Sequence, residues 1–458
     1  MSKNKNAWLN LKDDEKQKVM DLNKKYIDFL NVSRTERLAN REIIRQAKEN
    51  GFVDIEDLIA KKTQLKAGDR VYVDQKGKAV LMFVIGSDPI DEGLNIVGAH
   101  IDSPRLDLKQ NPLYESDGLA MLKTHYYGGV KKYQYATIPL AIHGIVFNKS
   151  GEKIEINIGL DEDDPVFCVS DLLIHLSKDQ LSKSMNDGIT GEMMNVIVGN
   201  MPLKDEEKDA VKANILKLIK EKYNFEEEDF KVAELEVVSA TKARELGLDR
   251  SMVLAYGQDD RICAFATLEA ILEVKNPKRT ALAIFADKEE IGSVGNAGMD
   301  SHMFENAVAE VVNLCGDYCH LRLMRTLRDS KVLSADVSAG YDPDFAYAFD
   351  KLNSAYIGNG VCINKYTGSR GKGGSNDANA EFLNEVRKVF DDAEVTWQTA
   401  ELGAVDQGGG GTIALLLSKY GAEVVDCGPA VLSMHSPHEI SSKVDTYMSY
   451  KAYKAFME

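Results

Sequence analysis

The sequence lacks the features that mark membrane, secreted and nucleic-acid-binding proteins. It has no run of about 18 uncharged apolar residues, so we predict no membrane-spanning helix. Its first residues lack the apolar core of a signal peptide. The 56 Lys and Arg residues are outnumbered by 72 Asp and Glu residues, and this excess of acid argues against a nucleic-acid partner. We therefore expect a cytoplasmic protein that binds neither a membrane nor a nucleic acid.

Cysteine is also scarce. The six cysteines show no CxxC spacing, which argues against a disulfide framework and against a cysteine zinc site. Cys315, Cys319 and His320 leave a metal site open as an alternative, but no second pair of ligands lies nearby. We predict that Cys315 and Cys319 are a reduced pair on a buried helix face.

A chain of 458 residues with 44% hydrophobic content is long enough for two cores. Apolar residues recur at helical spacing from 12 to 50, and residues 70–85 are typical of a β-hairpin. From about 106 to 238, apolar and polar residues alternate as in strands, with one amphipathic helix around Val211 to Ile219. After 239 strands and helices alternate. We predict a main α/β domain in two segments, 1–105 and 239–458, with an inserted β-rich domain at 106–238. In the second segment we expect a helix from Ser375 to Phe390 and another opened by Gly408 to Gly411.

Two adjacent carboxylates follow the most apolar predicted strand. The run 280–286 (TALAIFA) is typical of a central strand covered on both faces, and Glu289 and Glu290 come just after it. In an open α/β sheet, ligands bind outside the carboxyl ends of such strands. The alternative is a solvated acidic helix start, where carboxylates favour the positive end of the helix dipole.

Other predicted strands end in residues of the same kind. These are His100 and Asp102, Asp259 and Asp260, Asp336, and His435. Each histidine alone would more often be a hydrogen-bonded core residue, but together with these acids they predict a dinuclear metal site. Zinc accepts imidazole and carboxylate ligands, and cobalt and manganese suit the same donors. In such a site a carboxylate bridges two ions roughly 3.5–4 Å apart and a further carboxylate takes a proton from activated water. We expect Asp102 to orient His100, and the Glu289–Glu290 pair to supply one ligand and one base.

Five stretches, VGAHIDSPRLDLK, GQDDRICAF, DKEEIGSVG, SADV and SMHSPHE, resemble in the same order the site motifs of the aspartyl aminopeptidase and vacuolar aminopeptidase I family of dinuclear zinc peptidases. The resemblance spans nearly the whole chain. It implies an α/β fold of the phosphorylase/hydrolase-like zinc peptidase type, in which helices sandwich a mixed, largely parallel sheet and a β-rich dimerisation domain is inserted.

The resemblance also implies roles for individual residues. His100, Asp259, Glu290, Asp336 and His435 would be ligands of two Zn²⁺ ions per subunit, with Asp259 bridging, Glu289 the base and Asp102 orienting His100. A cis peptide is implied at Asp259–Asp260. The inserted domain would pair subunits into dimers that close into a tetrahedral dodecamer. A histidine of that domain would reach the neighbour's active site, and His143 is our candidate, with a buried strand histidine as the alternative.

The sequence departs from the aspartyl-specific members after Asp336, where Val337-Ser338-Ala339 stands in place of a His-rich segment, so an acidic substrate preference is not predicted. Lys365, Arg370 and Lys372 could bind a substrate carboxylate or form a solvated loop. Gly408 and Gly409 could offer backbone N–H groups to substrate or form a plain tight turn.

We predict a metalloaminopeptidase that releases N-terminal residues from peptides with a free N-terminus. One alternative is another amide hydrolase on the same framework, such as a carboxypeptidase or deacylase. The second is a non-enzymatic assembly or cargo protein, against which the spare base Glu289 argues.

Overall fold

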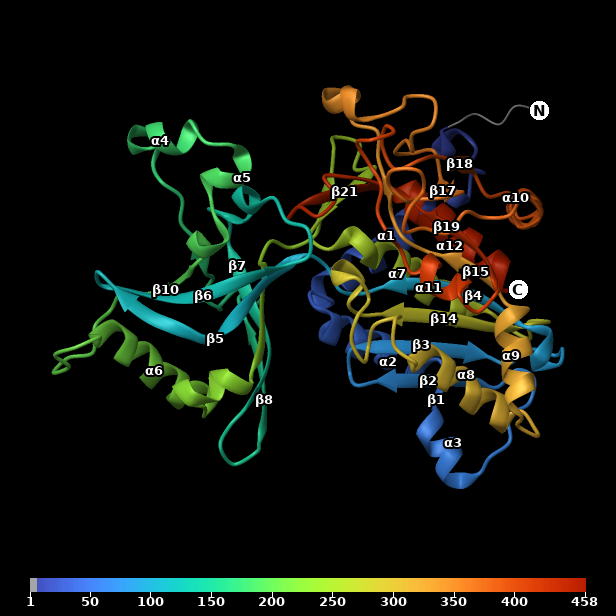
Figure 1. Ribbon diagram of the computed structural model, residues 1–458, viewed down its shortest axis with the longest axis horizontal. Coiled ribbons are helices and arrows are strands. Elements are labelled where there is room, and N and C mark those ends of the chain that lie inside the picture. Colours follow the sequence, from blue (N-terminus) through green and yellow to red (C-terminus); the bar gives the residue numbers. More distant parts are fainter. Residues whose placement is uncertain (1–5) are drawn as a thin grey trace. The chain divides into compact units, whose positions relative to one another are not determined.

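The structure, a computed structural model, describes residues 6–458 and divides the chain into two compact units (Figure 1). Unit 1 comprises residues 6–102, 243–434 and 438–458, and unit 2 comprises residues 103–242 and 435–437. Within the described range, none of the helices combines the length and apolar character that crossing a bilayer requires.

Unit 1 is built on a nine-stranded mixed sheet. In spatial order its strands are β1 (Val53–Asp54), β2 (Arg70–Gln75), β3 (Ala79–Val84), β14 (Thr280–Ala286), β4 (Leu94–His100), β15 (Lys331–Ser334), β19 (Glu423–Gly428), β17 (Val361–Asn364) and β18 (Trp397–Thr399). β4 pairs in parallel with both β14 and β15, whereas β3 pairs antiparallel with β14. The predicted α/β class with a mixed, helix-covered sheet is confirmed.

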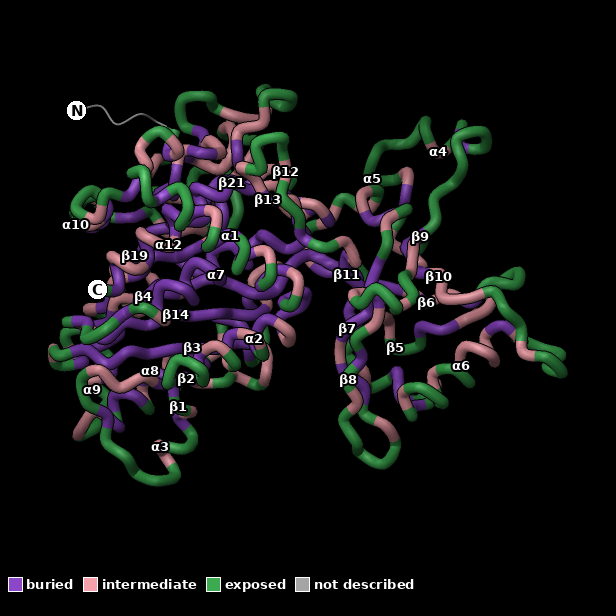
Figure 2. The backbone as a smooth tube through the Cα atoms, turned by 180° about the vertical axis from the view of Figure 1, so that it is seen from behind, coloured by how far each residue is buried: buried purple, intermediate pink, exposed green. Residues whose placement is uncertain are grey.

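Helices cover both faces of this sheet, which explains the continuous apolar run of β14. Ala281, Ala283 and Phe285 belong to one hydrophobic core and the alternate residues Leu282 and Ile284 to the other. Successive side chains of a strand point to opposite faces, so both sets must be apolar. Figure 2 shows the buried strands between the helices. The first core is covered by α1 (Glu15–Val32), α2 (Glu36–Glu49), α7 (Gln258–Glu273), α10 (Ala380–Asp392) and α12 (Lys443–Met457); the second is covered by α3 (Ile55–Lys61), α8 (Met303–Leu314), α9 (His320–Arg328) and α11 (Ala414–Ser418).

A smaller five-stranded sheet also belongs to unit 1. Its strands, in order, are β12 (Arg244–Leu246), β13 (Met252–Ala255), β21 (Glu439–Ser442), β20 (Ala430–Leu432) and β16 (Ser338–Ala339). β13 leads directly into α7, so this sheet fixes where that helix begins.

Unit 2 contains a seven-stranded antiparallel sheet with its own core. The strands are β8 (Lys153–Ile158), β7 (Leu140–Phe147), β11 (Glu234–Ser239), β5 (Arg105–Ser116), β6 (Leu119–Tyr127), β10 (Val196–Gly199) and β9 (Cys168–Val169); the helices are α4 (Lys178–Leu181), α5 (Met185–Gly188) and α6 (Ala210–Tyr223). The first strand and the last strand of this unit in sequence, β5 and β11, pair with each other, with Leu106 opposite Val237.

Three local expectations were wrong. The helix expected from Ser375 begins at Ala380, because the preceding residues form a loop in which Lys365 and Lys372 both bind Asp377. The helix expected after the glycines at 408–411 is only the short α11. Cys319 is exposed, in the turn before α9, and is not on a buried helix face. All six cysteines are free thiols, as predicted.

Candidate metal centre

Three neighbouring parallel strands carry the predicted site residues at their carboxyl ends. His100 is the last residue of β4, opposite Ala286 of β14. Glu289 and Glu290 follow β14, and Asp336 follows β15. Because parallel strands end at the same edge of a sheet, side chains far apart in sequence meet there.

The two aspartates of the GQDDR motif enter the same place from the start of α7. Asp259 and Asp260 lie at its first turn, after Gly257 with a positive φ of 74°. Glycine has no Cβ to oppose this conformation. The peptide bond between Asp259 and Asp260 is cis, as predicted. Asp260 Oδ2 accepts the backbone N–H of His100 at 3.2 Å, which fixes the end of β4 against α7.

The imidazole of His100 is held with its two nitrogens in different surroundings. Nδ1 lies 3.0 Å from the carbonyl oxygen of Asp102 and 3.3 Å from its Oδ1, whereas Nε2 lies 3.2 Å from Oδ1 of Asp259. A proton on Nδ1 therefore has an acceptor, and this leaves Nε2 directed at the carboxylates. The ring is only 2% exposed, so its orientation is set by these contacts.

Asp102 has a second set of contacts that the sequence did not reveal. Its Oδ1 accepts the backbone N–H of Glu289 and its Oδ2 accepts that of Glu290, both at 3.2 Å. One fully buried carboxylate thus holds both residues of the Glu289–Glu290 pair as well as His100.

Two groups of possible metal ligands share His100. One contains Asp259 and Glu290, and the other contains Asp260 and Asp336, with the ligand atoms of each group within 4.8 Å of one another. Glu289 is in neither group, although its Oε2 lies 3.8 Å from His100 Nε2. Asp260 was not among the predicted ligands, and the doubled aspartate in the sequence was the signal that pointed to it.

The buried carboxylates repel one another. Burial raises the pKa of Asp260 well above its ordinary value, and the charge of Asp336 adds to this shift. Burial likewise raises the pKa of Asp336, with a further contribution from the charge of Glu289. A bound divalent cation would offset this repulsion and keep the carboxylates ionised. Imidazole with several carboxylates is also a donor set that zinc accepts, so the residues fit zinc.

His435 is placed with unit 2. Its Nδ1 lies 2.8 Å from the carbonyl oxygen of Gly129. An imidazole that binds a metal through Nε2 usually donates its other N–H to such an acceptor. Its role as a ligand stays a prediction.

His143 lies in β7, 1% exposed, with Nδ1 3.0 Å from Oδ1 of Asn157. Glu236 stands opposite it on β11. This position favours the alternative that it is a buried strand histidine, because its side chain does not reach the surface of the chain.

In the loop at 365–372, which we predicted to be cationic, both lysines form ion pairs with an aspartate. Lys365 and Lys372 both bind Asp377, and the Lys372 amine also lies 3.9 Å from the ring centre of Tyr366. Arg370 has no ion pair among residues 6–458. It lines a cavity of about 140 Å³ in unit 1 together with Gly408.

The two glycines of the other loop are explained by close packing. A Cβ on Gly408 would lie 1.7 Å from the carbonyl oxygen of Leu402, and one on Gly409 would lie 2.5 Å from Ser369. This supports the tight-turn alternative for both residues, since no larger residue fits.

A buried imidazole surrounded by carboxylates at the carboxyl edge of a parallel sheet is the arrangement of a metal-dependent hydrolase. A model of the family described as aminopeptidase I zinc metalloprotease (M18) matches residues 29–457. The chain is 54% identical, over 454 residues, to a probable M18 family aminopeptidase 1 of Clostridium acetobutylicum, covering 99% of this chain and 98% of that protein.

The solved structures agree. A crystal structure of an M18 aminopeptidase from Thermotoga maritima has a TM-score of 0.94 and 45% identity, covering 99% of this chain and 98% of that one. At 19% identity, the S. cerevisiae mApe1 dodecamer shares the fold, with a TM-score of 0.74 over 94% of this chain and 95% of that one. The chain belongs to the aminopeptidase I zinc metalloprotease family, M18. It is a zinc-dependent metalloaminopeptidase, as the sequence predicted.

Proposed function

We propose that this aminopeptidase binds two zinc ions per subunit through His100, Asp259, Glu290, Asp336 and His435, with Asp259 bridging. The proposal is supported by the two ligand groups that share His100. Cobalt or manganese would suit the same donors. When bound, zinc supplies Lewis acidity, which lowers the pKa of water toward about 7 and polarises the carbonyl of the scissile bond.

Glu289 acts as the base in this proposal. The observation that carries the assignment is that Glu290 belongs to a ligand group whereas Glu289 does not, although Asp102 holds the backbone of both residues. Glu289 takes the proton from the attacking water and then delivers it to the leaving amine. Its carboxylate is 14% exposed, so it can receive this proton from the accessible side of the cluster.

Replacement of Glu289 by Gln tests this division of roles. The amide keeps the size of the side chain but accepts no proton, so we expect kcat to fall by about 10²–10⁴-fold while zinc content stays the same. Glu290→Gln is the matched control, and it should lose zinc. If Glu289→Gln loses zinc and Glu290→Gln keeps it, the two roles are reversed.

The substrate class is a peptide with a free N-terminus. A pair of peptides that differ only in N-terminal acetylation separates this activity from the carboxypeptidase and deacylase alternatives. Only the free peptide should release its first residue. A panel of aminoacyl amides, tested with zinc, cobalt and manganese, measures which N-terminal residue is preferred. Repeating the panel with Arg370→Ala measures whether Arg370, which lines the cavity of about 140 Å³, contributes to that preference.

Unit 2 serves assembly in this proposal, as the inserted dimerisation domain predicted at 106–238. The segment 172–185 exposes apolar side chains, among them Ile174 and Leu176 at 67% each. Contiguous exposed apolar surface marks a protein interface, and a second copy of this chain is the partner we propose. Dimers formed in this way would close into a homo-dodecamer with tetrahedral symmetry, and light scattering measures the mass. A cytoplasmic location is proposed because the six free thiols suit a reducing compartment.

His143 stays our candidate for the histidine of unit 2 that acts on a neighbouring active site, and a buried strand histidine is the alternative that its 1% exposure favours. His143→Ala should lose activity without losing zinc or assembly, and mixing it with Glu289→Gln subunits should restore part of the activity. Full activity of folded His143→Ala would show that His143 makes no such contribution.

A further inference from the structure

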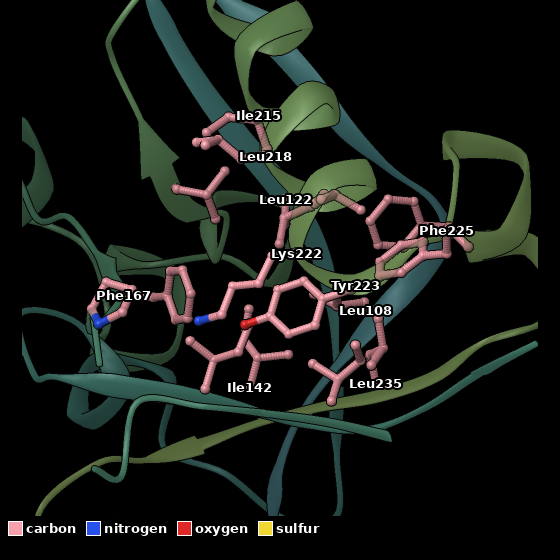
Figure 3. A pocket seen from close by; sticks show the side chains of 16 residues that line it. Leu108, Leu122, Ile142, Phe167, Ile215, Leu218, Lys222, Tyr223, Phe225 and Leu235 are labelled. Atoms are coloured by element: carbon pink, nitrogen blue, oxygen red, sulfur yellow. The ribbon is translucent and has the colours of Figure 1, made fainter. Parts of the chain in front are cut away.

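Unit 2 contains an apolar cavity between α6 and its sheet. The cavity measures about 270 Å³ and is lined on the strand side by Leu122, Ile142 and Leu235 and on the helix side by Ile215 and Leu218 (Figure 3). It lies wholly within unit 2 and contains none of the predicted metal ligands or the base.

The cavity exists because α6 does not close on the sheet. Its apolar residues Val211, Ile215, Leu218 and Ile219 follow helical spacing and should pack against the strands. Val211 is buried and Ile215 and Ile219 pack half-buried against the core, but Leu218 is 51% exposed. The strand side is apolar and covered, with Leu122 and Ile142 each 5% exposed. The space between α6 and the buried strand residues can therefore hold a small apolar ligand.

The lining of this apolar cavity includes one positively charged side chain. Lys222 is the only charged residue in the lining, and its amine lies 5.1 Å from the ring centre of Tyr223. Figure 3 shows the Lys222 side chain running between Phe167 and Tyr223, with the amine nitrogen and the phenol oxygen on the same side of the cavity.

The other lysines of α6 are all paired. Lys212 binds Glu227, Lys217 lies 3.8 Å from Glu221, and Lys220 lies 3.2 Å from Glu226. Lys222 has no carboxylate within ion-pair distance among residues 6–458, and Asp164, which acts on it from farther away, accepts the backbone N–H of Gly159. The Lys222 ammonium is exposed and interacts with the Tyr223 side chain, but among residues 6–458 no carboxylate forms an ion pair with it. A cation in this position at the rim of an apolar cavity suits a ligand that brings one negative charge on an apolar body.

We propose that unit 2 binds a small amphipathic carboxylate, with its apolar chain in the cavity and its carboxylate at Lys222 and the Tyr223 hydroxyl. A cavity of roughly 150 Å³ holds benzene, so a cavity of this size holds about ten non-hydrogen atoms. Octanoate has this size and is the probe.

Titration calorimetry on the full-length zinc-loaded enzyme tests the proposal. Octanoate should bind once per chain, about twofold to fivefold more tightly than octanol or octylammonium, because only octanoate brings a negative charge to the exposed ammonium of Lys222. Lys222→Met should remove this preference and leave octanol binding unchanged. Lys220→Met, on the same helix but outside the lining, is the matched control and should bind octanoate like the wild type.

A second variant tests the location. Leu218→Trp fills the cavity from a half-exposed position and should abolish binding of both octanoate and octanol, while unchanged peptidase activity and melting temperature show that the chain is folded. Three results would overturn the proposal. These are no octanoate binding by the wild type at millimolar concentration, equal affinity for octanol and octanoate, and undiminished octanoate binding by folded Leu218→Trp.

Discussion

The contacts of Asp102 predict an effect larger than the loss of one histidine partner. In Asp102→Asn, one carboxylate oxygen becomes an NH₂ group. The wild-type carboxylate accepts two backbone N–H groups, from Glu289 and Glu290, so in either orientation of the amide one donor faces another donor. His100 keeps the carbonyl oxygen of residue 102 at 3.0 Å from Nδ1 and should stay oriented. The substitution therefore acts mainly on the Glu289–Glu290 pair.

The magnitude follows from these contacts. A hydrogen bond to a charged acceptor contributes about 1.5–3 kcal/mol, and a buried donor left without a partner costs about 1–3 kcal/mol. Because both effects describe the same lost contact, they are not added, and we expect a total of about 1.5–3 kcal/mol against the active arrangement of the pair. At about 1.36 kcal/mol for each factor of ten, kcat/KM should fall roughly 10-fold to 150-fold.

Asp445 offers a matched control for the assay. It is also fully buried and also accepts two backbone N–H groups, from Gly358 at 2.6 Å and Gly360 at 2.7 Å, but it has no contact with the metal centre. Asp445→Asn should lose stability in thermal unfolding and keep kcat/KM on the best aminoacyl amide, whereas Asp102→Asn should lose both. The reasoning is refuted if Asp102→Asn keeps kcat/KM within twofold of the wild type, or if excess zinc restores its activity in full.

Three further predictions concern the same centre. Asp259→Asn should bind zinc weakly, because a bridging carboxylate serves both ions; elemental analysis that finds two tightly held ions would move the bridge to Asp260. Gly428→Ala places a Cβ 2.1 Å from the carbonyl oxygen of Asp336, so we expect displacement of that ligand and loss of zinc, while Gly410→Ala, with nothing within 4 Å, should change neither zinc content nor activity. Removal of zinc by a chelator should lower the melting temperature, and adding zinc back should raise it progressively with zinc concentration, since a ligand that binds only the folded chain stabilises it. An unchanged melting temperature would contradict binding at this buried cluster.

The parts of the fold that follow from periodicity could be predicted. β14 was found at its observed limits because both of its faces are buried, which leaves a continuous apolar run. Glu289 and Glu290 could be predicted as site residues for the same reason, because two charged side chains directly after a buried apolar strand need a partner. The exposure of His143 could not be predicted from the spacing of apolar residues. Its neighbours on β7 are buried on both faces of the sheet, so no alternation of apolar and polar residues shows which face is exposed.

Close approach of backbones could not be predicted. Gly428 admits the carbonyl of Asp336, and this contact joins segments about 90 residues apart in the sequence. The two hydrogen bonds from Asp102 to Glu289 and Glu290 likewise depend on the end of β4 lying beside the turn after β14. Such contacts follow from the order of the strands in the sheet, which the spacing of apolar residues does not reveal.

The pairing of β5 with β11 has a consequence for the history of the chain. Leu106 and Val237 face each other only a few residues inside the boundaries of unit 2, so the polypeptide enters and leaves this unit through adjacent strands. A segment with this geometry can be gained or lost as one piece, because the host chain is cut at one point and no strand of its sheet has to be rethreaded. His100 and Asp102, immediately before the cut, belong to the host. If unit 2 serves assembly as proposed, the chemistry and the assembly of this chain reside in two separable pieces that are joined between Asp102 and Ala243.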